Sequence, residues 1–112
     1  MRSAGIVWVD RARVLEEARR IAQDLRAQHS EIERVMLIGS FARGEGGPRS
    51  DLDLVLLVRS TSISPRDRPT HYLPASPRPV DLVVYTRGEV DRFGATPPPI
   101  LREALERGIE LA

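Results

Sequence analysis

Hydrophobic positions near the start of the chain recur with the spacing of an α-helix. Between residues 11 and 28 the apolar side chains that fall on one helical face are Val14, Leu15, Ala18, Ile21, Ala22 and Leu25. This spacing predicts an amphipathic helix over 11–28. Asp10, directly before it, is a favourable N-cap, and Val9 and Val14 are spaced for a hydrophobic staple.

Three short apolar runs farther along predict strands. They are RVMLIG (34–39), DLDLVLLV (51–58) and RPVDLVVY (78–85), each short and rich in branched aliphatic residues. A glycine-rich loop joins the first two, with one helical turn expected from Ser40. The connection over 59–77 holds four prolines and four serines, which predicts a long loop. A loop of this length is unusual in a compact domain, so we expect it to be functional, mobile or ordered by a partner.

The C-terminal part predicts two helices. Thr86 and Glu89 form a capping-box pattern that opens a short helix ending near Phe93. Thr96 and Pro97 are expected to start a last helix that Gly108 ends. The final letters IELA fit a short terminal strand. This order of elements predicts a small mixed-sheet α/β (α+β) fold.

Composition narrows the class of protein. A length of 112 residues predicts a single domain over 1–112. The 17 basic residues, all arginine, nearly balance 16 acidic ones, so we expect no general nucleic-acid binding. No apolar run approaches the roughly 20 residues of a membrane span. Without cysteine, disulfides and thiolate metal sites are excluded, and a cytoplasmic location is expected. The absence of lysine excludes lysine-based catalysis.

Two aspartates interrupt the second apolar run, where burial of bare carboxylates is unfavourable. Because side chains alternate along a strand, Asp51 and Asp53 project to the same side, about 7 Å apart at their Cα atoms. That spacing lets both bind one divalent ion or share two, and Mg²⁺ prefers such oxygen ligands. Asp81 lies in the third predicted strand and joins the pair if that strand pairs beside the second.

The loop before these aspartates carries groups suited to phosphate. Gly39 permits a sharp turn at the strand end, and Ser40 offers a hydroxyl at the start of a helical turn. Arg43 and Arg49 are placed to add positive charge, although a solvated surface role is open for both. A phosphate cradle next to carboxylate-held metal ions is what phosphoryl or nucleotidyl transfer requires.

These motifs resemble the signature of the DNA polymerase beta-like nucleotidyltransferase superfamily, and most closely the minimal nucleotidyltransferases. The stretch GSFARGEGGPRSDLDLVLLV carries most of the resemblance, whose core spans 35–84. The matching residues are Gly39, Ser40, Arg43, Gly44, Asp51, Asp53 and Asp81. The long segment before Asp81 departs from the family, and nothing in it matches a known acceptor-binding element.

The resemblance implies an activity and a partner. Asp51 and Asp53 would bridge two Mg²⁺ ions, with Asp81 completing one of them, and Gly39 and Ser40 would hold the β- and γ-phosphates of ATP. An acceptor hydroxyl would attack the α-phosphate and release pyrophosphate. In the antitoxin branch of the family, AMP is transferred to a tyrosine of an all-helical HEPN toxin and silences its RNase activity. A homodimer would also supply an acceptor surface.

Two other functions stay open at the level of sequence. One is transfer to a small molecule such as an antibiotic, and the other is a binding module that neutralises its partner by contact alone. His29 and His71 lack partners at metal-binding spacing, which favours ordinary surface roles. Trp8 and Tyr72 are predicted to be packing or interface groups.

Overall fold

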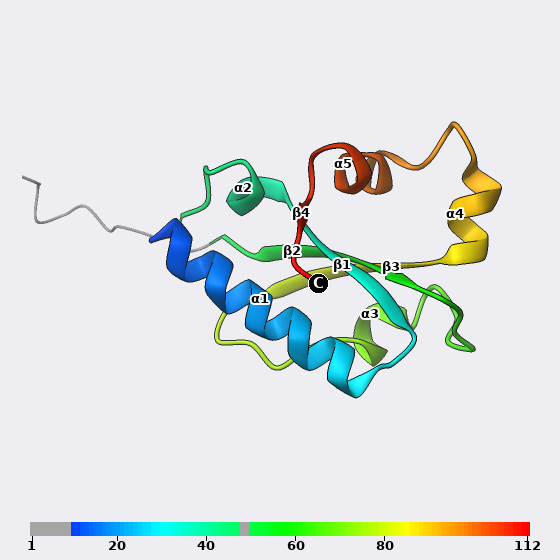
Figure 1. Ribbon diagram of the computed structural model, residues 1–112, viewed down its shortest axis with the longest axis horizontal. Helices are drawn as coiled ribbons and strands as arrows, with labels where there is room; N and C mark the ends of the chain where they lie inside the picture. Colours follow the sequence, from blue (N-terminus) through cyan, green and yellow to red (C-terminus); the bar gives the residue numbers. More distant parts are fainter. Residues whose placement is uncertain (1–9, 48–49) are drawn as a thin grey trace, which may run out of the picture.

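The computed structural model describes residues 10–47 and 50–112. Its helices are α1 (Arg11–Gln28), α2 (Gly39–Ala42), α3 (Arg68–His71), α4 (Arg87–Phe93) and α5 (Pro99–Arg107). Its strands are β1 (Ile32–Ile38), β2 (Leu52–Val58), β3 (Val80–Thr86) and β4 (Ile109–Glu110). Figure 1 shows their arrangement along the chain.

The strands form one mixed sheet in the order β3-β2-β1-β4. β1 runs antiparallel to β2 and to β4, whereas β2 and β3 are parallel. Parallel neighbours need a crossover connection, and the segment between β2 and β3 provides it. The predicted mixed-sheet fold is therefore confirmed, and the long connection has a topological reason.

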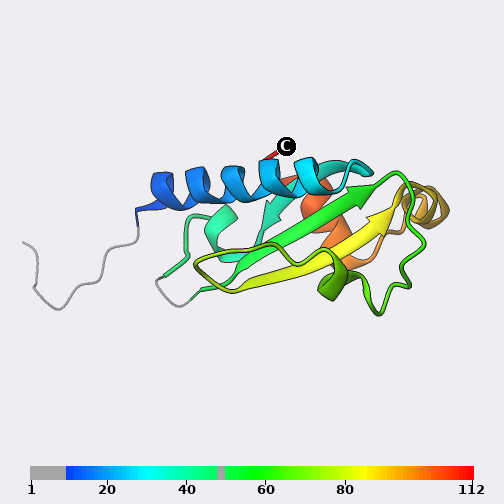
Figure 2. The ribbon, with the colours of Figure 1, turned by 90° about the horizontal axis from the view of Figure 1, so that it is seen from below.

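Alternation along the strands divides the core into two clusters, one on each face of the sheet. The buried residues on the α1 face include Val35, Leu37, Leu52, Leu54, Leu56 and Val58. Those on the α5 face include Met36, Ile38, Val55, Leu57, Leu101 and Ala104. Figures 1 and 2 show α1 and α5 on opposite sides of the sheet.

The local signals at the two ends of the chain are mostly confirmed. Asp10 caps α1 by accepting from the backbone N–H of Ala12 and Arg13; its predicted staple partner, Val9, lies outside the described residues. Thr86 and Glu89 form the expected capping box of α4. At the end of α5, a Cβ on Gly108 would lie 2.5 Å from a carbonyl oxygen, which explains a glycine there.

The start of the last helix differs from the prediction. α5 begins at Pro99 rather than at Thr96–Pro97. The Thr96 hydroxyl instead donates to the carbonyl of Phe93, at the end of α4. From sequence alone, a threonine before prolines could either start the next helix or cap the end of the preceding one. Here its hydrogen bond to Phe93 shows that it belongs to the end of α4. β1 likewise begins at Ile32, two residues before the predicted strand.

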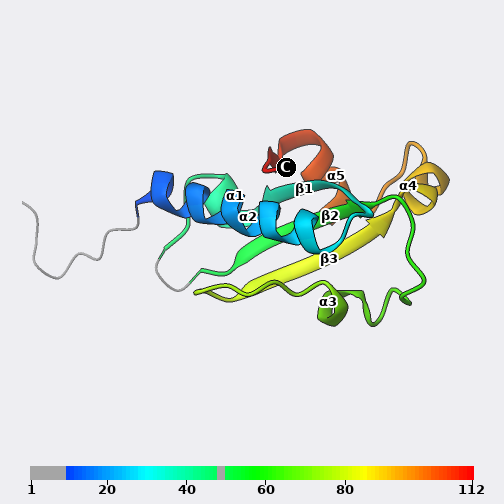
Figure 3. The same cartoon turned by 60° about the horizontal axis from the view of Figure 1, so that its bottom comes forward.

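The segment over 59–77 is an ordered part of the fold. It contains α3 and runs alongside β3 in space (Figure 3). Arg68 is buried and donates to the carbonyls of Ile63 and Val84 and to the carboxylate of Glu89. Tyr72 is fully buried in the core, so its predicted packing role is confirmed, whereas Trp8 lies outside the described residues.

The same segment brings the two histidines together, contrary to the expectation that they lack partners at metal-binding spacing. The fold brings His71, on α3, beside His29 and Glu31, with one ligand atom from each within 4.8 Å of the others. The partners were missed because His29 and His71 are far apart in sequence and meet only through the packing of α3. Over residues 10–47 and 50–112, no helix is long and apolar enough to cross a membrane.

Candidate active site

Strand pairing places the three aspartates predicted from sequence at the same end of β2 and β3. In the parallel β2/β3 register, Asp53 lies directly opposite Asp81, and Asp51 precedes β2 by one residue. Neighbours Leu52 and Leu54 point into the α1-face core, so alternation directs Asp51 and Asp53 to the α5 face. Asp53 is half-buried, and Asp51 and Asp81 are exposed.

The backbone at Gly39 approaches this group closely. Ile38, the last residue of β1, pairs with Asp53, so the chain turns into α2 directly beside that carboxylate. Gly39 has a φ of +78°, and a Cβ there would lie only 2.2 Å from Oδ2 of Asp53. Both the left-handed backbone and the close approach require glycine at this position.

A fourth carboxylate, Glu103 of α5, enters the site and was not predicted. Its Oε2 accepts the backbone N–H of Gly39 at 3.1 Å and lies 3.5 Å from Nη1 of Arg43. The backbone of Gly39, a residue that the resemblance assigns to phosphate binding, therefore already donates to an anionic oxygen. The only signal for Glu103 in the sequence is its place between buried Leu101 and Ala104, which carries no functional information.

The carboxylates perturb one another. Burial, followed by the charges of Asp81, Asp51 and Glu103, raises the pKa of Asp53, while Arg43 works against the shift. The site thus concentrates negative charge with little compensation, which favours binding of a cation.

Three of these side chains, Asp53, Asp81 and Glu103, line a cavity of about 180 Å³. Its walls are Ile38, Gly39, Asp53, Leu54, Asp81, Val83, Ile100 and Glu103. The polar side chains among them are carboxylates alone, without imidazole or thiol. Hard cations such as Mg²⁺ prefer this donor set, so the residues fit the ions that the sequence predicts.

The remaining predicted residues lie beside the cavity, except for Arg49, which is not among the described residues. Ser40 is half-buried in α2. Arg43 caps the end of α2 and is exposed, with ion pairs to Glu45 at 3.1 Å and to Glu103. Arg11 of α1 donates to the carbonyls of Phe41 and Ala42, which ties α2 to α1. Arg49, predicted to bind nucleotide, lies outside the described residues.

The sequence is similar to a known protein family over most of its length. A sequence model of the nucleotidyltransferase domain matches residues 18–111. No curated protein sequence matches the chain.

Solved structures share the fold at low sequence identity. A proposed nucleotidyltransferase from Sulfolobus solfataricus superposes with a TM-score of 0.59 and 22% identity, covering 89% of this chain and 80% of the other. A toxin–antitoxin structure with AMP-PNP has a TM-score of 0.53 and 18% identity, covering 84% and 72%. A mutant of the toxin–antitoxin MntA-HpeT has a TM-score of 0.48 and 14% identity, covering 93% and 73%.

Proposed function

We propose, because the chain belongs to the nucleotidyltransferase domain family, that it transfers a nucleoside monophosphate, AMP from ATP, to a hydroxyl acceptor with Mg²⁺. The acceptor oxygen forms a bond to the α-phosphorus as the bond from that phosphorus to the β-phosphate oxygen breaks. Pyrophosphate leaves with the electron pair of the broken bond, and the hydroxyl proton passes to solvent. Neither an oxidant nor a reductant is needed.

The observation that carries this proposal is the juxtaposition of Asp53, Asp81 and the Gly39 N–H. Two carboxylates lie side by side on adjacent parallel strands, and the Gly39 N–H already donates to a carboxylate oxygen 3.1 Å away. Carboxylates suited to cations and a backbone N–H able to bind an anionic oxygen are therefore contiguous, which supports the proposal. Nucleotidyl transfer needs both in one place.

Each residue has a role that follows from its position. Asp51, Asp53 and Asp81 would hold the metal ions, which neutralise developing charge and favour ionisation of the attacking hydroxyl when bound. The N–H of Gly39 and the hydroxyl of Ser40 would bind the outer phosphates.

Arg43 and Glu103 set the charge around the phosphate position. Arg43, now paired with Glu45 and Glu103, would turn to the phosphates once nucleotide enters. The triphosphate must displace Glu103 from the Gly39 N–H, because both are acceptors for the same donor. Displacement also moves a like charge away from the incoming phosphates.

We further propose that the acceptor is a tyrosine on a HEPN-type toxin, for which this chain is the cytoplasmic antitoxin. One structure of the same fold is a toxin–antitoxin with AMP-PNP, which supports a toxin as partner. The cavity beside the aspartates is small, about 180 Å³, which supports an acceptor held on another surface. A second copy of this chain is the other candidate for that surface.

The test is an incubation of ATP labelled at the α-phosphate with Mg²⁺, this protein and the candidate toxin. We expect label on the toxin, lost with chelator and with Asp53→Asn, and retained with Asp24→Asn, which alters an exposed aspartate of α1. Label that appears only on a small hydroxyl compound would assign the small-molecule activity instead.

A binding module is separated from an enzyme by the same variants. If Asp51→Asn/Asp53→Asn still binds the toxin but no longer neutralises it, catalysis is supported. Neutralisation that survives this double substitution would show that contact alone is sufficient and would overturn the catalytic proposal.

A further inference from the structure

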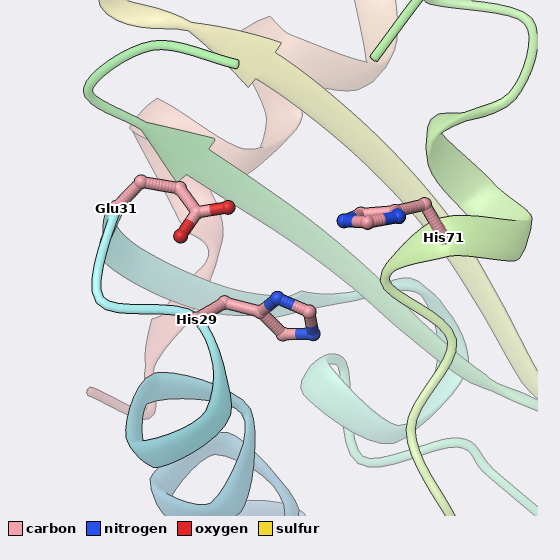
Figure 4. Close-up of side chains that lie close together, drawn as sticks. All are labelled: His29, Glu31 and His71. Atoms are coloured by element: carbon pink, nitrogen blue, oxygen red, sulfur yellow. The ribbon is translucent and has the colours of Figure 1, made fainter. Parts of the chain in front are cut away.

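His29, Glu31 and His71 form a cluster of metal-binding side chains away from the aspartates. His29 caps the C-terminus of α1, Glu31 lies just before β1, and His71 is the last residue of α3. One ligand atom from each lies within 4.8 Å of the others. Figure 4 shows that the three side chains come from two separate segments of the chain, His29 and Glu31 from one and His71 from the other.

Tyr72 contacts all three side chains of this cluster. Its ring is buried, with its centroid 4.8 Å from that of His29 and 4.7 Å from that of His71. Its hydroxyl donates to Oε2 of Glu31 at 2.6 Å. Partners of this kind orient metal ligands in proteins. The hydrogen bond uses one carboxylate oxygen and leaves the other for an ion.

The donor set indicates the class of metal. Two imidazoles and one carboxylate suit a borderline transition ion, with Zn²⁺ foremost, rather than Mg²⁺. Ligands of a tetrahedral Zn²⁺ ion lie roughly 3.3 Å apart, given Zn–N and Zn–O distances near 2.0 Å. Since the ligand atoms lie within 4.8 Å of one another, no pair would need to close by more than about 1.5 Å, a movement open to the exposed side chain of His71.

We propose that His29, Glu31 and His71 bind a Zn²⁺ ion that fastens the 59–77 segment to the turn between α1 and β1. The site is separate from the aspartates. Ile32, next to Glu31, pairs with Val58 at the last position of β2. Asp53 lies near the other end of this strand, about 17 Å from Val58 at 3.3 Å per residue. The Zn²⁺ site therefore stands apart from the proposed transfer reaction.

The experiment uses the full chain after chelator treatment and dialysis. Titration calorimetry with Zn²⁺ should find one site, and Co²⁺ should give visible absorption bands of a four- or five-coordinate ion. We expect His71→Ala to weaken Zn²⁺ binding at least tenfold and His29→Ala to do the same. Thr70→Ala, the neighbouring exposed residue of α3, is the matched control and should bind like the wild type.

Two further variants locate the ion. Tyr72→Phe keeps the ring but removes the bond to Glu31, so we expect a smaller loss of affinity than with His71→Ala. Asp53→Asn/Asp81→Asn should retain the site, because its ligands are elsewhere.

The proposal is overturned if Zn²⁺ does not bind, or if both histidine variants bind it as the wild type does. Loss of Zn²⁺ binding in the aspartate variant alone would also overturn it. Circular dichroism checks that each variant is folded. If His29→Ala does not fold, the proposal is tested with His71→Ala alone, because His71 is exposed.

Discussion

A methyl group at position 39 would lie 2.2 Å from Oδ2 of Asp53, on backbone with a φ of +78°. We expect Gly39→Ala to displace that carboxylate and to reduce nucleotidyl transfer about 100-fold or more, which corresponds to roughly 2.7 kcal/mol. The rate is measured with α-labelled ATP, and stability by thermal unfolding.

Two other glycines separate strain from displacement. Gly94 has a φ of +56° with open space around its Cβ position, and Gly47 has open space without the positive φ. Gly94→Ala should cost about 1 kcal/mol or more of stability and leave activity unchanged, and Gly47→Ala should alter neither. Gly39→Ala with normal activity would show that the Asp53 carboxylate needs no fixed position.

Glu103 competes with phosphate for one N–H group, and its removal gives a second prediction. We expect Glu103→Gln to lower the KM for ATP several-fold, because the negative charge next to Gly39 is removed while α5 keeps its packing. Steady-state kinetics at saturating Mg²⁺ measure it, with Glu106→Gln, an exposed residue of α5, as control. A higher KM together with a weaker dependence on Mg²⁺ would instead place Glu103 among the metal ligands.

The candidate residues that sequence could predict are those whose spacing is local. Gly39 and Ser40 directly follow one strand. Asp51 and Asp53 alternate along the next, so their shared side follows from strand geometry. Asp81 needed the pairing of β2 with β3, which sequence does not specify. Glu103 was missed because its approach to Gly39 depends on how α5 packs across the sheet.

At the scale of elements, buried Arg68 fastens the 59–77 segment to β3 and α4. It donates to Val84 and pairs with Glu89 at 2.7 Å, with side chains 7% and 19% exposed. We expect Arg68→Met to destabilise the protein by about 3 kcal/mol, since one partner is left without compensation. Arg68→Met/Glu89→Gln should recover part of that loss in denaturant titrations. Equal loss in both variants would mean that packing, rather than charge pairing, holds the segment.

The same pair predicts a dependence of stability on pH. Burial raises the pKa of Glu89, but hydrogen bonds from Arg68 and the Thr86 backbone outweigh it, and the pKa is lowered overall. Because the pKa of Glu89 is lower in the folded than in the unfolded state, ionised Glu89 stabilises the protein at pH values above the ordinary pKa near 4.5. This stabilisation is lost as the pH falls through the folded-state pKa. Unfolding free energy measured from pH 6 to about 3 should therefore fall less steeply in Glu89→Gln than in the wild type. Parallel curves would contradict this.

The elements that sequence predicted well are those whose signals are close together. α1 has its cap and its apolar face within 19 residues, Asp10 to Gln28, and α4 has its capping box. α3 was missed because its stabilising contacts, from Arg68 to Val84 and Glu89, join residues far apart in the chain. The proline content of 59–77 indicated an irregular path but not a buried arginine.

At the scale of the whole molecule, the sheet separates two cores, and the aspartates share a face with α5. Leu101 is fully buried in the α5-face cluster, and Leu25 is 1% exposed in the α1-face cluster. Truncation of either to alanine should cost about 2–5 kcal/mol. Only Leu101, however, holds the helix that places Glu103 at Gly39.

We therefore expect Leu101→Ala to lower the KM for ATP in the same direction as Glu103→Gln, and Leu25→Ala to leave it unchanged. In Leu101→Ala/Glu103→Gln the two effects on KM should not add, because both act by removing one carboxylate from one N–H. The kinetics are measured at a temperature where calorimetry shows all variants folded. An equal change of KM in Leu25→Ala would mean that loss of stability alone alters the site. Additive effects in the double variant would mean that α5 acts on ATP through contacts other than Glu103.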